Sequence, residues 1–489
     1  MRDWQAGQIQ EPEQAEQQAV TTTPNLISIK NAMGNIGKNS YGFLISQWLS
    51  QSAVIYRNSL FSRLNSASAV AAATVAPLNY AWLTIGAGAM RSSNNFYGNY
   101  AGLELGKRWR VAVLYGLAVG IFCVMPGYLA SPYAMPLLHL GSASFSLAFR
   151  YNLISMIGAP FRMVRTVDRH FFVKTNKQNL LIYLGVFQSI SSCVASYFLN
   201  KIIPVEGIPL GQILGAAFGF LITLGYLFKN AAFEGYGLFR WGLLPWNDCK
   251  SLFKEGFHNG ASYLAENFAN IGMMIMMSLI SKEALVANNI VNQAAQPFIL
   301  ASFSLGVGLQ RALNIQNIQE GWSYFKASFL LVGMVYASSI GMYFLTPFIS
   351  ELFLGSQNSE NQETFKLTKT LMAWAIFGGL GDHLRNINSG GQQSFKDTGF
   401  IMGTTIVCRG LIATGLSIYL GFKQSLGAEG VIIGHQVGVT LGGIAQTARL
   451  AWNIHRNSQA LHQPILPRTM SVVPSSELRS ASLASNTSA

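Results

Sequence analysis

The sequence predicts an all-α polytopic membrane protein with twelve transmembrane helices, arranged as two six-helix pseudo-repeat bundles. Three observations support this prediction: long apolar segments recur along the 489 residues, 50% of the residues are hydrophobic, and only 11% are charged. An apolar run of about 20 residues can cross a hydrocarbon core of about 30 Å as a helix. A soluble protein of this size would not carry such runs from one end to the other.

Polar segments divide the chain into five expected regions. They are a disordered cytoplasmic tail (1–40, with a short amphipathic lead-in from Ile27), an N-terminal six-helix bundle (41–228), a cytoplasmic connector (229–255), a C-terminal six-helix bundle (256–452) and a second disordered cytoplasmic tail (453–489). The spans expected in the first bundle are 42–62, 67–90, 109–130, 137–160, 179–199 and 208–228. Those expected in the second are 256–280, 284–308, 326–349, 367–385, 398–421 and 428–452. The first tail lacks the pattern of a signal peptide.

The basic residues lie mainly in loops on one expected side of the membrane, and the net charge of the chain is +13. Loops on the side of both termini hold 17 Lys and Arg residues: 91–110, 162–177, 229–255, 311–326 and 385–397. The opposite loops hold five: Arg63, Lys201, Lys282, Lys366 and Lys423. This asymmetry predicts that both termini are cytoplasmic. It also explains the charged group Arg162, Arg165, Asp168, Arg169 and His170 as a topology signal, and no nucleic-acid partner is expected.

Two apolar spans carry polar stripes that predict a polar cavity inside the protein. One stripe consists of Asn259, Tyr263, Glu266 and Asn270, and the next consists of Asn289, Asn292, Gln293 and Gln296. Their spacing places each set on one face of a helix, and lipid would not satisfy these groups. For the amides, hydrogen bonds that hold the bundle together remain an alternative. A carboxylate such as Glu266 costs about 2.5–3.5 kcal/mol to insert, so we interpret it as functional.

The two halves of the chain also resemble each other. Residues 151–225 and 368–444 each contain an apolar span, a charged stretch, a span rich in small and polar residues, a short loop with Gly, and a Gly-rich span. Internal duplication is typical of transporters whose binding site lies at the repeat interface. No catalytic, ATP-binding or metal-ligand motif is recognisable, so we expect a non-enzymatic protein without a cofactor, driven by an ion gradient or the substrate's own gradient.

Several segments, in order, resemble one transporter family. LAENFANIG around Glu266 is similar to its helix 7, and VANNIVNQAAQPF to the helix that follows. LGDHLRNINSGGQQSFKDTGF, with Asp382 fifteen residues before Asp397, is similar to its helix 10 region. SLGAEGVIIG resembles the start of the family's helix 12. In the first half of the chain, SASAVAAATV is similar to the family. Over about residues 41–452, the chain resembles the multidrug and toxic compound extrusion (MATE) transporters of the multidrug/oligosaccharidyl-lipid/polysaccharide flippase superfamily.

The resemblance implies a V-shaped secondary exporter that moves organic, often cationic, compounds by antiport with protons or sodium ions through alternating access. Glu266 and Asp382 correspond to carboxylates of the family's C-terminal lobe, so the resemblance implies that the proton or sodium ion binds there. Asn386, one turn after Asp382, is expected to line the substrate cavity with the two polar stripes. A structural ion pair between Asp382 and Arg385, three residues apart, remains an alternative.

The N-terminal bundle departs from the family pattern. Arg57 stands where prokaryotic members usually carry an aspartate, and no acidic residue lies between Lys177 and Lys201. A cavity-lining Arg57 favours a flippase-like transporter of a lipid-linked or anionic substrate. Snorkelling to the interface or pairing with a carboxylate is the structural alternative for this arginine. A further alternative is a MATE-derived membrane receptor or scaffold that does not transport.

The expected partners are a small-molecule substrate and the lipid bilayer. We expect a monomer that needs only a proton or sodium ion for coupling. Short loops and the lack of a transit peptide favour an integral protein of a bacterial inner membrane.

Overall fold

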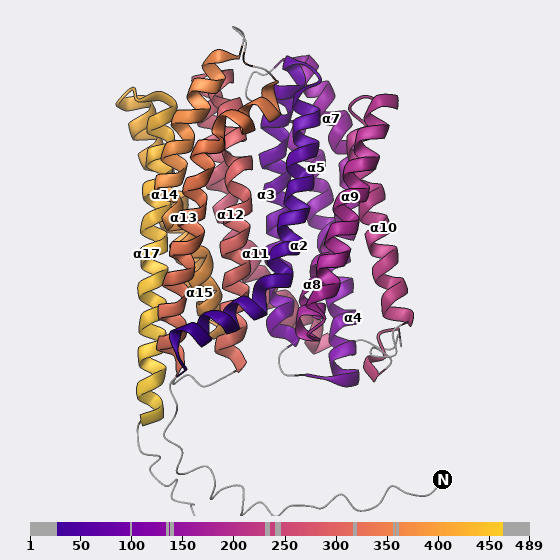
Figure 1. The fold of residues 1–489 in the computed structure, drawn as a ribbon, viewed down its shortest axis with the longest axis vertical. Coiled ribbons are helices and arrows are strands. Elements are labelled where there is room, and N and C mark those ends of the chain that lie inside the picture. The colour runs from indigo at the N-terminus through magenta and orange to yellow at the C-terminus, as the bar shows by residue number, and fades with distance from the viewer. Residues whose placement is uncertain are drawn as a thin grey trace, which may run out of the picture.

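The computed structural model describes residues 27–462, apart from 98–99, 134–135, 137–140, 230–234, 240–245, 316–319, 356 and 358–360. Every regular element within these residues is a helix, and the long helices run side by side (Figure 1). Eight of the described helices are long and apolar enough to cross a membrane. The chain is therefore an all-α polytopic membrane protein, as the sequence predicts.

Each of the first six predicted spans corresponds to a helix or to a short run of helices. The single helices are α2 (Ile29–Ser62), α3 (Ser66–Tyr97), α9 (Gln178–Ile202) and α10 (Gly207–Lys229). The third span is a run of α4 (Gly102–Val119), η1 (Gly120–Val124), α5 (Met125–Ala130) and η2 (Ser131–Tyr133). The fourth is a run of α7 (Ser142–Ser155), η3 (Met156–Gly158) and α8 (Ala159–Lys174), and its predicted residues 137–140 lie outside the described part of the chain.

The last six predicted spans are matched in the same way. The single helices are α11 (Trp246–Ile280), α12 (Lys282–Ile315), α13 (Gly321–Leu354), α14 (Gln362–Ser394) and α17 (Gly427–His462). The eleventh span is a run of α15 (Thr398–Thr404), η6 (Thr405–Ala413), α16 (Thr414–Ile418) and η7 (Tyr419–Lys423). Both η6 and η7 are π-helical. Figure 1 shows α2 to α10 on one side of the molecule and α12 to α17 on the other.

Two helices extend into the predicted tails. α2 begins at Ile29, where the Ser28 Oγ accepts a hydrogen bond from the Asn31 backbone N–H at 3.2 Å. Its first turns cross the end of the C-terminal bundle (Figure 1), and Ile36 packs in a buried cluster with Leu309 and Tyr324. α17 likewise continues to His462. Residues 29–40 and 453–462 are therefore helical, whereas 1–26 and 463–489 lie outside the described residues.

The structure corrects the predicted cytoplasmic loop at 162–177. α8 continues to Lys174, and its apolar face is buried against α3 and α4 through side chains such as Met163, Val167 and Phe171. The density of charge suggested a loop, but α8 is an amphipathic helix whose arginines Arg162, Arg165 and Arg169 share the side that lines the cavity. This continuation matters because it carries three arginines into the middle of the protein.

The C-terminal bundle is built on a close approach between α12 and α14. A Cβ atom added at Gly390 would lie 2.0 Å from the backbone oxygen of Gly306, and one added at Gly306 would lie 2.4 Å from the Asn386 backbone oxygen. Small residues at such crossings let two helix backbones approach closely. Between the bundles, α2 packs against α12 and α3 packs against α11. These contacts enclose the site described next.

Candidate substrate cavity and carboxylate–arginine cluster

A cavity of about 380 Å³ lies between the two bundles. Side chains from both bundles line it, among them those of α2, α3 and α8 from the first bundle and of α11, α12 and α14 from the second. Ten of the eleven residues that the sequence predicts for the site contribute to its wall: Arg57, Tyr263, Glu266, Asn270, Asn289, Asn292, Gln293, Gln296, Asp382 and Asn386. The remaining one, Asn259, lines a much smaller pocket of about 20 Å³, which also includes Tyr263 and Glu266. The predicted residues are thus brought together, and their roles remain predictions.

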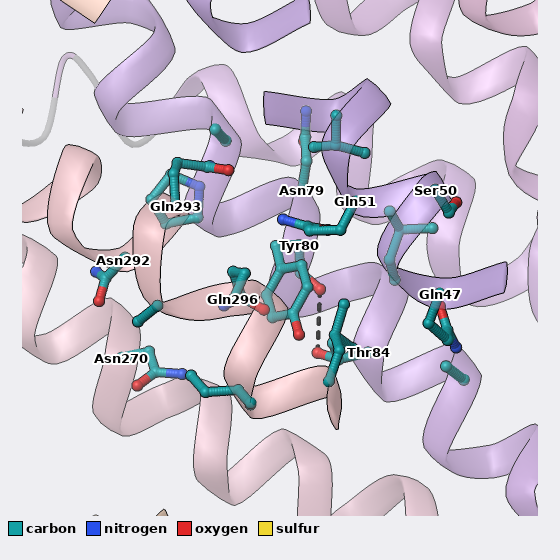
Figure 2. Close-up of a pocket in the computed structure, with 18 of the residues that line it drawn as sticks. Gln47, Ser50, Gln51, Asn79, Tyr80, Thr84, Asn270, Asn292, Gln293 and Gln296 are labelled. Atoms are coloured by element: carbon teal, nitrogen blue, oxygen red, sulfur yellow. Dashed lines mark hydrogen bonds between the residues drawn. The ribbon is translucent and has the colours of Figure 1, made fainter. Parts of the chain in front are cut away.

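Amide side chains face one another across this cavity. Figure 2 shows Asn292, Gln293 and Gln296 of α12 on one side, with Gln47 and Gln51 of α2 on the other. The side-chain oxygens of Asn289, Gln293 and Gln296 are buried and have no hydrogen-bond partner among the described residues. Interhelical hydrogen bonds therefore do not account for these oxygens. They are available to a polar ligand or to water.

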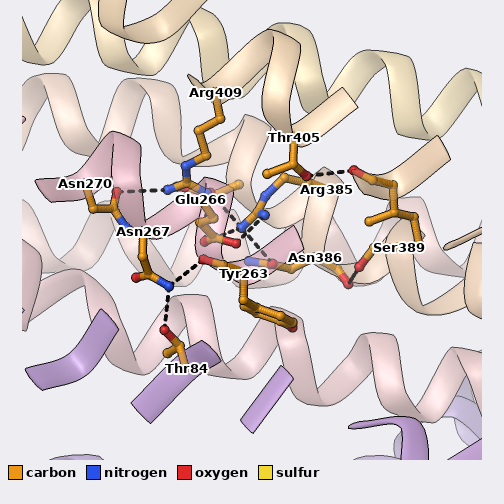
Figure 3. Close-up of polar contacts among 12 residues, drawn as sticks. Thr84, Tyr263, Glu266, Asn267, Asn270, Arg385, Asn386, Ser389, Thr405 and Arg409 are labelled. Carbon is orange, nitrogen blue, oxygen red and sulfur yellow. Dashed lines mark hydrogen bonds and ion pairs between the residues drawn. The ribbon is translucent and has the colours of Figure 1, made fainter. Parts of the chain in front are cut away.

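Glu266 on α11 lies between two arginines of the C-terminal bundle (Figure 3). Its Oε2 and Oε1 accept hydrogen bonds from Nη1 and Nη2 of Arg385 at 2.7 and 2.8 Å. Arg409 donates from Nη1 to Glu266 Oε1 at 2.9 Å and to Asp382 Oδ1 at 3.1 Å. Arg385 Nη2 lies 3.5 Å from Asp382 Oδ1. These four residues form a carboxylate–arginine cluster with two negative and two positive charges.

The carboxylate–arginine cluster is buried and held by further polar groups. Its four side chains are at most 15% exposed. Asn270 Oδ1 accepts a hydrogen bond from Arg409 Nη2 at 3.4 Å, and Asn386 Oδ1 accepts one from Arg385 Nη2 at 3.1 Å. Arginine pairs two nitrogens with the two oxygens of a carboxylate, which fixes the geometry as well as the charge. Removing one member would leave a buried charge unbalanced.

The sequence anticipates only part of the carboxylate–arginine cluster. The Asp382–Arg385 pair that it left open is present, but the main partner of Arg385 is Glu266, 119 positions away in the chain. Arg409 was not predicted at all. It lies in the π-helix η6, inside the apolar segment TIVCRGLIA. An arginine inside a membrane span is itself a functional-site signal, and this rule would have found it.

Arg57 is buried and does not pair with a carboxylate in the described residues. It is 4% exposed, and its Nη1 donates a hydrogen bond to Ser192 Oγ at 2.7 Å. Three arginines of α8 line the same cavity. We call these four residues the arginine wall: Arg57, Arg162, Arg165 and Arg169. The α8 members thus do more than signal topology, which is all the sequence suggested for them.

Hydrogen bonds join the two bundles around the cavity. Asn267 Nδ2 on α11 donates to Thr84 Oγ1 on α3 at 2.7 Å. Arg91 Nη1 on α3 donates to the Tyr263 hydroxyl on α11 at 3.2 Å. Asn267 is a site residue that the predicted stripe missed, because it lies beside the stripe rather than on it.

Comparison with known proteins places these features in context. No protein-family model matches the sequence. A probable multidrug resistance protein NorM of Bacillus subtilis is 25% identical over 369 residues, which cover 72% of this chain and 78% of the relative. A protein of the same name from Bradyrhizobium diazoefficiens is 24% identical over 399 residues, covering 78% of this chain and 84% of the relative.

Solved structures share the fold at low sequence identity. An inward-facing multidrug resistance MATE family transporter of the MOP superfamily has a TM-score of 0.67 at 14% identity, covering 83% of this chain and 95% of its own. A MOP superfamily transporter from Pyrococcus furiosus has a TM-score of 0.70 at 14% identity. The match covers 90% of this chain and 99% of the transporter's chain. The latter is described as having a binding pocket of reverse polarity that suggests a different function. These likenesses concern the fold.

Proposed function

Because this chain is a membrane transporter of the MATE family, we propose that it is a secondary active exporter that carries small organic molecules by alternating access. One observation carries the proposal: the 380 Å³ cavity is built from both bundles and lies between them. Cavities of about 300–1,000 Å³ suit small organic ligands. In repeat-built transporters, rocking of one bundle against the other opens such a site to each side in turn.

The composition of the cavity wall supports an amphipathic substrate. Aromatic side chains such as Tyr80 and Phe303 offer apolar surface, and the amides of α12 offer hydrogen-bond acceptors. A pocket that is mainly apolar, with a few placed polar groups, binds organic molecules and fixes their orientation. We therefore infer that the substrate has an apolar body and at least one polar group.

The balanced charge of the carboxylate–arginine cluster affects how a coupling proton or sodium ion could bind there. Glu266 and Asp382 each already accept a hydrogen bond from a guanidinium, so in this conformation a proton or sodium ion would have to replace Arg385 or Arg409. We infer that the two arginines serve as built-in counter-charges here. Coupling by cation exchange at the carboxylates would then require a conformation in which an arginine leaves.

Proton- or sodium-coupled export of organic cations at Glu266 and Asp382 is the second candidate. One observation favours it: both carboxylates line the cavity, and the guanidinium of Arg409 donates a hydrogen bond to each of them. A cation that displaced this guanidinium would meet two negative groups at once. In this function, the coupling ion and the substrate would compete for the same pair of carboxylates.

Transport by purified protein in proteoliposomes tests both candidates. A fluorescent organic cation is loaded, and its efflux is followed under a proton gradient and, separately, under a sodium gradient. Cation antiport predicts gradient-driven efflux that is lost in Glu266→Gln and Asp382→Asn, while Glu429→Gln, an exposed carboxylate on α17, behaves as wild type. Efflux that neither gradient drives would reject cation antiport. Failure to transport cationic, neutral and anionic fluorophores alike would reject the exporter.

A further inference from the structure

The arginine wall gives the N-terminal bundle a positive charge that faces the cavity. Between residues 27 and 229 the chain has only three acidic residues, Glu104, Asp168 and Glu206. None of the three lines the cavity. The carboxylate–arginine cluster cannot balance this charge either, because its two carboxylates are matched by its own two arginines. The cavity therefore has a net positive lining on the side of the N-terminal bundle.

Each of the three acidic residues of this bundle is engaged elsewhere. Asp168 is 4% exposed, and its Oδ1 accepts a hydrogen bond from Trp109 Nε1 on α4 at 2.9 Å, which turns it away from the cavity. Glu206 pairs with Arg150 at the opposite end of the bundle from α8's last turn. Glu104 lies within 3.7 Å of basic side chains one turn along α4. Asp168 acts electrostatically on Arg165 of the arginine wall, whereas no acidic residue among the described ones pairs with Arg57 or Arg162.

Arg57 and Arg162 form the part of the arginine wall with the most defined surroundings. Arg57 Nη1 donates to Ser192 Oγ at 2.7 Å, and Arg162 Nη1 donates to the Tyr128 hydroxyl at 2.8 Å. Arg162 Nη2 is buried and has no hydrogen-bond partner among the described residues. The two positive charges repel each other. Two guanidinium groups with only neutral hydrogen-bond partners, that of Arg57 buried and that of Arg162 partly buried, favour a bound anion.

An aromatic surface adjoins the two arginines. Tyr151 and Phe61 stack with ring centroids 4.7 Å apart and planes 10° from parallel, and both line the cavity. Such rings provide apolar contact for a flat or aliphatic group. The site therefore combines two cationic donors with an apolar wall, which is the complement of an amphipathic organic anion.

We propose that Arg57 and Arg162 bind the oxyanion of the transported molecule, a carboxylate or a phosphate, while its apolar body lies against Tyr151 and Phe61. This inference rests on the proposed function, because it names the class of molecule that the exporter carries. Guanidinium recognises both oxyanions through paired N–H donors. The oxyanion can belong to a soluble organic acid or to a lipid headgroup, since the chemistry of recognition is the same.

Binding to the full-length protein, purified in a neutral detergent, tests the site without requiring transport. Isothermal titration calorimetry compares 1-naphthoate with uncharged 1-naphthamide and cationic 1-naphthylmethylammonium, which share one aromatic body. We expect the anion to bind at least about tenfold more tightly than the other two, because hydrogen bonds to a charged group are the strong ones. Arg57→Gln and Arg162→Gln should each weaken naphthoate binding about tenfold and leave naphthamide binding unchanged.

Matched variants keep the result interpretable. Arg150→Gln removes an arginine of the same bundle that is paired with Glu206 and lies outside the cavity, and it should bind naphthoate as the wild type does. Arg57→Lys keeps the positive charge and should retain part of the affinity. Naphthamide binding and a single monodisperse peak in size exclusion show that each variant is folded. Equal naphthoate affinity in wild type and both Gln variants, or tighter binding of the cation, would overturn the proposal.

A competition arm separates the two sources of the oxyanion. Phosphatidylglycerol in mixed micelles is compared with diacylglycerol, which has no phosphate. Displacement of naphthoate by phosphatidylglycerol alone assigns the site to a lipid headgroup, and lack of displacement by either assigns it to a soluble organic acid. Wild-type protein that binds naphthoate in this pattern but exports nothing would reject the exporter and leave the anion site standing. Export without charge-selective binding would reject the anion site and leave the exporter standing.

Discussion

Arg409 is one of the two arginines that balance the charge of the carboxylate–arginine cluster. Its Nη1 donates hydrogen bonds to both Glu266 and Asp382, at 2.9 and 3.1 Å. Arg409→Gln removes one of two positive charges and leaves two buried carboxylates with Arg385 alone. We expect a loss of about 3–5 kcal/mol of stability, because an unmatched buried charge is costly. Thermal unfolding in detergent, followed by intrinsic fluorescence, measures it.

A double variant distinguishes charge balance from simple loss of packing. Adding Asp382→Asn to Arg409→Gln restores neutrality, since Glu266 and Arg385 remain as a pair. The double variant should therefore be more stable than Arg409→Gln alone, which is a coupling that packing by itself would not give. If the second substitution lowers the melting temperature further, the cluster is not held together by charge balance.

At the scale of elements, the approach of α14 to α12 positions Asp382, Arg385 and Asn386. Gly390→Ala would place a Cβ atom 2.0 Å from the Gly306 backbone oxygen, so one of the helices must shift. We expect a loss of about 1–3 kcal/mol, the usual effect of overpacking. Gly333→Ala is the matched control, because a Cβ atom there meets nothing within 4 Å. Unfolding temperatures of the two variants should move in opposite directions, since alanine favours an open helix position.

A second element-scale prediction concerns the turn between α14 and α15, where Asp397 contacts α17. Burial, the largest single influence, acts to raise the pKa of Asp397. Hydrogen bonds from Arg449 at 2.6 Å and Asn453 at 3.0 Å, with the charge of Arg449, outweigh burial and hold the pKa below its ordinary value. A lowered pKa stabilises the fold above the unfolded value of about 3.9, and this contribution is lost as pH falls below it.

We therefore expect the wild type to lose up to about 1 kcal/mol relative to Asp397→Asn as pH falls from 6 to 3, a modest size because the pair is partly exposed. Melting temperatures of both proteins across this pH range measure the difference. Parallel curves for the two proteins would show that Asp397 does not contribute in this way.

At the scale of the whole molecule, movement of one bundle against the other can be stopped by a cross-link. Thr84 on α3 and Asn267 on α11 are in hydrogen-bond contact across the bundles at 2.7 Å. Joining cysteines at these two positions with a short bifunctional reagent should abolish transport while leaving each single-cysteine variant active. The background must first lose the four native cysteines, Cys123, Cys193, Cys249 and Cys408. Full transport by the cross-linked protein would contradict alternating access at this interface.

The helices are the part of the molecule that the sequence predicts best. Within the described residues, each expected span corresponds to a helix or to a run of helices, because apolar segments in a membrane have few other stable forms. The polar stripes of α11 and α12 also face the cavity, since helical periodicity decides which residues share a face. The continuation of α8 to Lys174 was not predicted. Its charged residues suggested a loop, whereas the apolar face between them is buried.

The sequence could not predict which residues far apart in the chain contact each other. Glu266 and Arg409 lie 143 positions apart, and only the packing of η6 against α11 brings them together. The sequence identified Glu266 as a candidate for binding a cation but contained no sign that the cation would be Arg385 or Arg409. Arg57 was assigned to the cavity from the resemblance. That three arginines of α8 line the same cavity became clear only from the continuation of that helix.

A membrane potential acts on the two bundles differently. Moving one elementary charge through 100 mV involves about 2.3 kcal/mol of electrical work. The carboxylate–arginine cluster carries equal numbers of both signs, so the field exerts no net force on it. The arginine wall carries positive charge with no cavity-lining carboxylate of its own bundle, and a bound oxyanion cancels part of it. If an oxyanion binds there as proposed, voltage pulls harder on the empty N-terminal bundle than on the loaded one, and the return step of the cycle becomes the electrically driven one.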